Sequence, residues 1–487
     1  MGKNASVFLR IAACLAVMSG AALSQPPSVE VDFSSVLQAW DGFGVNYVEV
    51  PQTRDYKANP QEYGGLSALT EAERERLLDL IWGNDGLRPG VLKMFLDPWH
   101  QQTAGGAYDH ETTTRWMRLF AREGLRRTRA RGGDLEVITT LYGPPAYMTK
   151  QKFIRGRDLD PDHRDGLAAY LIHWTRFLRE KEGLPVKYIS LHNEGEDFNR
   201  WPVDGKDAGA ASHDYNLFWP PPQLVDMIKR LRAALDSAGL RDVGVTPGEC
   251  TNWDRFVFWG HATSIATDAE ALRAIGLITS HGFTGGRDYW YSTHNPKGVQ
   301  LLRLSRPELH AWTTSMTWGK MDVAFLDDIR GQIYSVGVNA VIPWAAIQTQ
   351  GWVGGDPNPG TALRVDPATR SFQITPGYWL YKQVSRAGQP GMRVAAVKSG
   401  DNNVRLMAFA SAGSRHPDAF VVVNLAAEEK PLQIAVSGAG ARRFAAWRTS
   451  ASEQYQSAGT FALQDGRVSY TAPPRSATTF FAQSESR

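Results

Sequence analysis

The chain has 487 residues, which is long enough for two or three domains with large buried cores. Hydrophobic residues make up 43% and charged residues 21% of the sequence, a balance that excludes a disordered or fibrous protein. The formal net charge of +3 gives no indication of a nucleic-acid partner or of a membrane-surface partner.

The first residues have the pattern of a secretory signal peptide. A positive end, a short apolar stretch and a small-residue cleavage site follow one another between Lys3 and Ser24. Cleavage after Ser24 would remove one of the two cysteines and leave Cys250 alone, so the exported chain would have no internal disulfide. We therefore expect residues 1–24 to be a signal peptide and the protein to be secreted or periplasmic, and we predict no membrane span.

Strand and helix patterns alternate about eight times between Asp41 and Gln350, and this alternation predicts a closed parallel (β/α)8 barrel over residues 41–385. The expected strands lie at 42–46, 90–96, 137–141, 188–191, 243–246, 277–281, 309–315 and 339–344. The expected helices open at Thr70 and Thr267 and cover 113–129, 164–182, 224–235 and 326–336.

Short alternating strands follow from about Pro390, and turn residues separate them. They lie at 394–397, 404–409, 419–423, 432–436 and 478–481. This pattern predicts an antiparallel β-sandwich over residues 386–487. Residues 28–36 also alternate, so we expect the segment 25–40 to join that sandwich.

The fourth expected barrel strand ends in Asn193 and Glu194, which places both side chains at the carboxyl-terminal rim, where barrel active sites lie. Each polar residue at a strand end, taken alone, is most simply explained as a structural residue whose hydrogen bonds are made within the protein. Together they indicate a site, because one rim would gather them all. The residues concerned are Asp97, Tyr142, Asn193, Glu194, Glu249, His281, Trp312, Ser315 and Trp344.

Six segments, in the right order and spanning nearly all of the exported chain, resemble glycoside hydrolase family 30 and its relatives in clan A. They are Gly42-Phe43-Gly44, Tyr142 to Met148, Asn193-Glu194, Ser280 to Phe283, Pro390 to Val394, and Ser476 to Phe480. The resemblance implies a glycosidase in which Glu194 is the general acid/base and Asn193 binds a sugar hydroxyl.

The seventh strand departs from the family pattern. The family has a nucleophilic Glu after Trp-x-Thr, whereas Trp312-Thr313-Thr314 is followed here by Ser315. A serine hydroxyl does not replace a carboxylate nucleophile without an activating base, so the retaining mechanism does not carry over on this alignment.

Glu249 ends the fifth strand and is our candidate for the catalytic partner of Glu194. A carboxylate gap of about 5–5.5 Å would give retention and one of about 6.5–9.5 Å inversion, and the altered seventh strand favours inversion. Other carboxylates remain open: Glu196 as a substrate ligand or a like-charge neighbour, Asp97 as a more distant choice, and Glu308 only if the seventh strand is shorter than expected.

We predict an exported glycoside hydrolase without a cofactor or metal, acting on a plant, algal or microbial oligosaccharide or polysaccharide. Tyr142, His281, Ser315 and Asp97 would line the substrate site. The sequence contains sixteen tryptophans, of which Trp312, Trp344 and Trp201 would stack on sugar rings.

Two other interpretations remain. A catalytically silent barrel that binds polysaccharide would also lose its nucleophile and keep its aromatic residues. A metal site formed by His192, Glu194, Glu249 and His281 is the third interpretation, although no recognised His/Cys spacing supports it.

Overall fold

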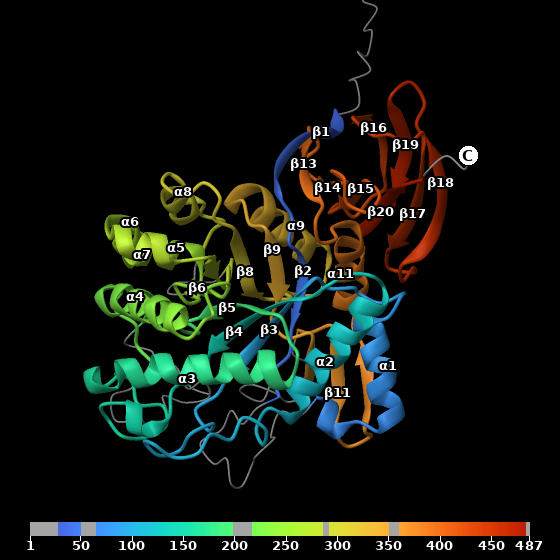
Figure 1. Cartoon of the computed structure of the whole chain (residues 1–487). Helices are drawn as coiled ribbons and strands as arrows, with labels where there is room; N and C mark the ends of the chain where they lie inside the picture. Colours follow the sequence, from blue (N-terminus) through green and yellow to red (C-terminus); the bar gives the residue numbers. More distant parts are fainter. Residues whose placement is uncertain (1–27, 50–64, 198–216, 286–291, 350–359, 484–487) are drawn as a thin grey trace, which may run out of the picture.

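A barrel of parallel strands surrounded by helices lies beside a domain of mostly antiparallel strands (Figure 1). In this computed structural model the described residues are 28–49, 65–197, 217–285, 292–349 and 360–483. The predicted fold class, a (β/α)8 barrel with an appended antiparallel β domain, is confirmed. None of the helices in these ranges has the length and apolarity needed to cross a bilayer. The expected signal peptide lies outside the described residues.

The barrel is an eight-stranded sheet whose spatial order follows the chain. Its strands are β2 (Gly42–Asn46), β3 (Val91–Leu96), β4 (Glu136–Leu141), β5 (Val186–Ser190), β6 (Gly244–Thr246), β7 (Ile278–Ser280), β8 (Ala311–Met316) and β9 (Ala340–Pro343). β2 pairs with β9. The seam between β6 and β7 is closed by the bridges Val245–Ile275 and Cys250–Ser280. All strands therefore end at one rim.

Helices cover the outside of the barrel (Figure 1). They are α1 (Glu71–Trp82), α2 (Arg115–Ala130), α3 (Arg164–Arg176), α4 (Pro221–Ser237), α5 (Trp253–Phe258), α6 (His261–Thr267), α7 (Ala269–Ala274), α8 (Lys297–Arg303) and α9 (Val323–Gly331). The Thr70 side chain caps α1 as predicted by accepting from the Glu73 N–H. The cap of α7 is Asp268 and not Thr267, because the Asp268 carboxylate accepts the first free N–H groups.

A nine-stranded sheet forms the second domain, in the order β18-β17-β20-β15-β14-β13-β1-β16-β19. Its strands are β1 (Val29–Ala39), β13 (Arg393–Ser399), β14 (Val404–Ala410), β15 (Ala419–Asn424), β16 (Lys430–Ser437), β17 (Arg443–Thr449), β18 (Gln456–Ala462), β19 (Arg467–Ala472) and β20 (Ser476–Ala482). The end strands β18 and β19 approach each other, so the sheet curves into a sandwich. The N-terminal strand β1 pairs with β13 and β16, far from β2.

The two domains share one hydrophobic core. Trp40 and Phe43 at the start of the barrel pack on Phe409 of β14, with ring centroids 5.2 and 5.8 Å from that phenylalanine. Helix α11 (Pro376–Ala387) lies between them, and its Tyr381 hydroxyl donates to the Gly44 carbonyl at 2.6 Å. A small sheet of β10 (Ile347–Thr349), β11 (Leu363–Asp366) and β12 (Ser371–Ile374), which the sequence did not predict, precedes this helix.

The barrel interior is layered. The layer nearest the amino-terminal ends is apolar and contains Val91, Ile138, Tyr188, Leu277, Trp312, Ala340 and Ile342. The layer above it contains fully buried polar side chains, among them Lys93 and Glu249. This second layer supports the rim, because its charges must be paired within the protein.

Candidate active site

Glu194 lies where the chain leaves β5. Its N–H donates to the Glu249 carbonyl at 2.8 Å, and the Glu249 N–H donates to the His192 carbonyl at 2.9 Å, so the extensions of β5 and β6 stay paired beyond the strands. Glu194 has a φ of 52°, in the left-handed region that residues with a side chain seldom adopt. Its side chain is only 7% exposed. The rim therefore holds this carboxylate in one position.

The imidazole of His281, just after β7, lies between two carboxylates. Nδ1 is 2.7 Å from Oε1 of Glu194, and Nε2 is 3.1 Å from Oε2 of Glu249. Burial and Lys93 both lower the pKa of His281, but the bonds to the two carboxylates outweigh them and the net shift is upward. His281 is thus favoured as an imidazolium that donates in both directions.

Glu249 is fully buried, and all its partners are inside the barrel. It forms an ion pair with Lys93 of β3 and accepts hydrogen bonds from Thr140 of β4 (2.5 Å) and Thr314 of β8 (2.9 Å). Burial raises the pKa of Glu249, but Lys93 and His281 together hold it well below the ordinary value. Glu249 is fully buried and is linked to Glu194 through the imidazole of His281, so its role as the catalytic partner of Glu194 stays a prediction.

Ser315, at the seventh-strand position, is also fully buried. Its Oγ accepts hydrogen bonds from Nζ of Lys93 (3.1 Å) and from Nδ2 of Asn46 (3.3 Å). The Ser315 hydroxyl is therefore held between a lysine and an asparagine. The Oδ1 atom of Asn46 has no hydrogen-bond partner among the described residues.

Asn193, which precedes Glu194, is 4% exposed. Its Oδ1 atom has no hydrogen-bond partner in the described part of the chain. A buried acceptor without a donor costs free energy, so such an atom beside Glu194 suits a donor supplied by a ligand.

The predicted aromatic residues have different positions. Trp312 is wrong as a sugar platform, because it lies in the apolar layer at the opposite end of the barrel and its Nε1 donates to Asp41 at 2.7 Å. Trp344 follows β9, is partly exposed and contacts Phe95 edge-on at 6.0 Å. Tyr142 follows β4 and is buried against the same Phe95 at 5.2 Å. Trp201 lies outside the described residues.

The remaining predicted carboxylates are engaged elsewhere. Asp97 is fully buried and accepts from Thr113 Oγ1 (2.7 Å) and the Trp99 N–H (2.8 Å), so it does not face a substrate directly. Glu196 is buried in an ion pair with Arg255 at 3.2 Å. Glu308 is exposed beside Arg306, outside the barrel.

Sequence reasoning missed Lys93 and Glu49. Lys93 is the one charged residue in the apolar run of β3, and a charge in such a strand requires a buried partner, which was a usable signal. Burial raises the pKa of Glu49 to about 7, although the N–H groups of Leu66 and Ser67 donate to its carboxylate. Glu49 ties the end of β2 to that later turn, and no sequence pattern indicated this contact.

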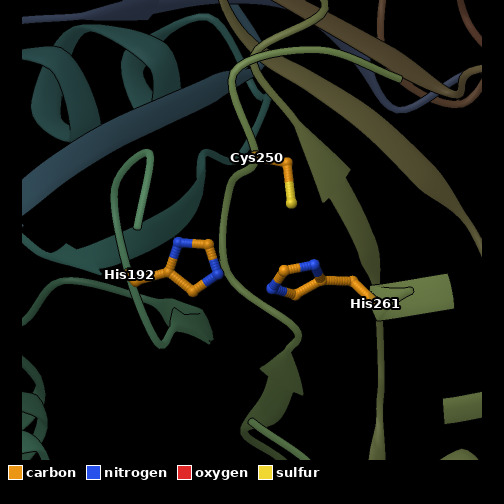
Figure 2. A group of neighbouring side chains, drawn as sticks. All are labelled: His192, Cys250 and His261. Atoms are coloured by element: carbon orange, nitrogen blue, oxygen red, sulfur yellow. The ribbon is translucent and has the colours of Figure 1, made fainter. Parts of the chain in front are cut away.

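Three potential metal ligands, His192, Cys250 and His261, meet beside the site, and each offers an atom within 4.8 Å of the others (Figure 2). All three are about 1% exposed. The Gly195 N–H donates to Nδ1 of His192 at 3.1 Å, which leaves the ring proton on Nε2, the nitrogen that faces His261 in Figure 2. That tautomer disfavours coordination through Nε2, so we interpret the three side chains as a buried packing cluster.

The metal set considered from the sequence, His192, Glu194, Glu249 and His281, does not form one site either. Both nitrogens of His281 are directed at carboxylates, and Glu249 is already paired with Lys93. These contacts account for the charges without a cation.

Acidification should destabilise the protein through the buried histidines. Burial lowers the pKa of His192 and of His261, so the unfolded chain binds more protons than the folded chain once the pH falls below the ordinary histidine value of about 6.5. Each such histidine should lower the free energy of unfolding by about 1.4 kcal/mol per pH unit below that value. Urea unfolding across this pH range checks the slope, and His261→Asn should make it shallower by about one proton.

Comparisons with known proteins support the fold. No protein-family model and no curated protein matches the sequence. Among solved structures, the catalytic domain of a GH30 xylanase C from Talaromyces cellulolyticus has a TM-score of 0.70 at 17% identity and covers 94% of this chain and 100% of its own. The GH30 subfamily 8 xylanase Xyn30A from Clostridium acetobutylicum has a TM-score of 0.69 at 18% identity, again over 94% and 100%. The chain has the fold of family 30 glycoside hydrolases.

A third similar structure is the endo-β1,6-glucanase BT3312, with a TM-score of 0.68 at 17% identity over 94% of both chains. The alignments cover nearly the whole of each partner, so the barrel and the β domain occur together in all three. At these identities the likeness establishes architecture, and residue roles have to be argued from the site itself.

Proposed function

We propose that this protein is a glycoside hydrolase in which Glu194 protonates the leaving oxygen of a glycosidic bond. The observation that carries the proposal is the hydrogen-bonded row Glu194–His281–Glu249 at the carboxyl-terminal rim of a family 30 barrel. A rim carboxylate with a proton donor 2.7 Å away has the parts of a general acid/base.

The proton would move along this row. His281 Nδ1 passes its proton to the carboxylate of Glu194, and the resulting carboxylic acid gives that same proton to the glycosidic oxygen as the carbon–oxygen bond breaks. Water then supplies the hydroxyl of the new sugar end, and its other proton passes through Glu194 back to Nδ1 of His281, which restores the resting state. Glu194 is thus reprotonated by His281, whose side chain is almost fully buried.

Glu249 and Lys93 would act as positioning residues. The negative charge of Glu249 on Nε2 keeps His281 oriented and protonated, and Lys93 balances that buried charge. In the resting state His281 and Lys93 carry positive charges, and Glu194 and Glu249 carry negative charges. The net charge of these four side chains is zero, as a barrel interior with little water requires. This assignment replaces a direct catalytic role for Glu249.

Asn193 would bind a sugar hydroxyl through its unpartnered Oδ1, and the partly exposed Trp344 would contact a sugar face. Both lie at strand ends, and so does Glu194. The similar structures are described as xylanases and an endo-β1,6-glucanase, so β-linked xylose and glucose polymers of plant or microbial origin are the substrates to test first.

The test is a panel of β-linked xylo- and gluco-oligosaccharides given to the wild-type protein and to Glu194→Gln. Release of new reducing ends by the wild type alone would support the proposal. The anomeric form of the first product, followed by proton NMR, separates inversion from retention.

A silent carbohydrate-binding barrel is the second candidate, because the sequence resemblance expects a nucleophilic Glu where the chain has Ser315, and both Ser315 and Glu249 are fully buried. Calorimetric titration with the same panel distinguishes the two. Binding of an oligosaccharide that neither protein cleaves would favour the silent barrel and overturn the enzyme.

Ser315→Ala should retain activity within a few-fold, because our mechanism gives this hydroxyl no bond to the substrate. The loss of one hydrogen bond to Lys93 should lower the free energy of unfolding by about 1–3 kcal/mol. Steady-state rates and urea unfolding check the two parts. Complete inactivation of a folded Ser315→Ala protein would instead make Ser315 the nucleophile.

Export belongs to the same proposal. A structurally similar protein is described as a conserved exported protein from Bacteroides fragilis, with a TM-score of 0.70 at 14% identity. We expect cleavage after Ser24, and N-terminal sequencing of the protein recovered from the periplasm or the medium checks it.

A further inference from the structure

Three histidines form an unbroken row between the surface and a buried carboxylate at the rim. Nδ1 of His173, on α3, is 2.6 Å from Nε2 of His110, and Nδ1 of His110 is 2.7 Å from Nδ1 of His100. Nε2 of His100 is 3.3 Å from Oδ2 of Asp97. His173 is exposed, whereas Asp97, His100 and His110 are buried. The row therefore connects solvent with the end of β3.

The row has one self-consistent arrangement of protons when every ring is neutral. The ionised Asp97 only accepts, so His100 carries its proton on Nε2 and must accept at Nδ1. His110 then donates from Nδ1 and accepts at Nε2, and His173 donates from Nδ1. The lone pair of His173 on Nε2 is left for solvent. One carboxylate thus dictates the tautomers of three rings.

We infer that Asp97, His100, His110 and His173 form a proton relay through which the rim of the barrel takes up one proton from solvent. The proton enters at Nε2 of His173, each ring hands its Nδ1 proton to the next, and the charge comes to rest on His100 beside Asp97. All three hydrogen bonds survive, because the donor and the acceptor merely exchange in the two bonds between rings.

The surroundings favour that resting place. The pKa of His110 is lowered to about 3, mainly by burial and also by His100 and His173, although Asp109 raises it. Arg118 also opposes a charge on His110, and burial and Arg176 lower the pKa of His173. Tyr108 stacks on His173 at 3.7 Å, while Tyr170 contacts the His100 ring edge-on at 6.1 Å. A positive charge is therefore disfavoured on His110 and on His173.

The relay also has a structural consequence. His100 and His110 belong to the loop between β3 and α2, one of the loops that build the rim, and His173 belongs to α3. Because no bond is lost on proton uptake, the loop should stay attached to α3 while the charge beneath it changes. The relay thus lets the pH of the solvent set the charge of the imidazole beside Asp97 without moving the loop.

Nitrogen-15 NMR of the full chain with labelled histidine tests the relay. Two-bond proton–nitrogen correlations should show the Nδ1–H form for His110 and His173 and the Nε2–H form for His100 at neutral pH. On acidification the first two rings should change to Nε2–H while His100 becomes doubly protonated, all with one shared apparent pKa. Three independent titrations, or His110 in the Nε2–H form at neutral pH, would overturn the inference.

The Asp97→Asn variant gives a sharper test. In the wild type the Trp99 N–H donates to Oδ1 of Asp97 at 2.8 Å, and the carbonyl oxygen of the introduced asparagine should accept the same hydrogen bond. The side-chain NH2 group of the asparagine would then point toward His100. All three tautomers should then invert at neutral pH, and the shared proton uptake should be lost. Asp109→Asn on the same loop is the matched control, because Asp109 accepts hydrogen bonds from the N–H groups of Glu111 and Thr112 and makes none of the three hydrogen bonds of the row. Unchanged tautomers in a folded Asp97→Asn protein would contradict the relay.

Discussion

Glu194→Gln is expected to lower kcat on the cleaved oligosaccharide by about 10²–10⁴-fold, the usual contribution of a general acid. The amide keeps an acceptor for Nδ1 of His281 but has no proton to give to the leaving oxygen. Substrate binding should change little, since the amide is nearly the same size as the carboxylate. Steady-state rates and calorimetric titration measure the two effects separately.

Glu308→Gln is the matched control for this variant. Glu308 is an exposed glutamate at the other end of the barrel, and its loss should leave kcat and substrate affinity unchanged. Equal activity in Glu194→Gln and the wild type would remove Glu194 from the mechanism. A parallel loss in the control variant would point to a general effect of the substitution.

Breaking the buried Lys93–Glu249 pair should have the largest effect on stability. Either Lys93→Met or Glu249→Gln leaves a charge without its partner inside the barrel, and such a loss costs about 3–5 kcal/mol. In Glu249→Gln the pKa of His281 should also fall, because one of the two carboxylates that raise it is gone. Urea unfolding measures the first effect, and the alkaline limb of the pH–rate profile, where His281 loses its proton, should move to lower pH.

The double variant Lys93→Met/Glu249→Gln separates charge from packing. With both charges removed, a substantial part of the lost stability should return, because no uncompensated charge remains. Purely additive losses would mean that the pair contributes through packing alone. A loss below about 1 kcal/mol in both single variants would contradict a coupled buried pair.

The barrel could be predicted from the sequence because its strands are apolar runs separated by helices with amphipathic spacing. The same runs located Glu194 and His281, since His281 follows β7 directly and Glu194 lies in the segment that continues from β5 to the rim. The sequence could not predict how deep in the barrel each side chain lies. Trp312 and Ser315 are three residues apart on β8, yet the first belongs to the apolar layer and the second to the charged layer.

The sequence also did not indicate which side chains contact one another across the barrel. Glu249 was correctly recognised as a strand-end residue, but its burial depends on Lys93, Thr140 and Thr314, which come from three other strands. In the β domain, β17, β18 and β19 were missed, and two of them pair with strands that are not their neighbours in the chain. β17, for example, pairs with β20 as well as with its neighbour β18. Such pairing depends on tertiary contacts more than on local pattern.

Leaving-group dependence tests most directly whether Glu194 is the general acid. Aryl glycosides of the sugar that the panel identifies should be compared in the wild type and in Glu194→Gln, from phenyl to dinitrophenyl leaving groups. A dinitrophenolate departs without protonation, so the defect of the variant should be large for phenyl glycosides and nearly absent for dinitrophenyl glycosides. The same loss for every leaving group, in a folded variant, would contradict the role assigned to Glu194.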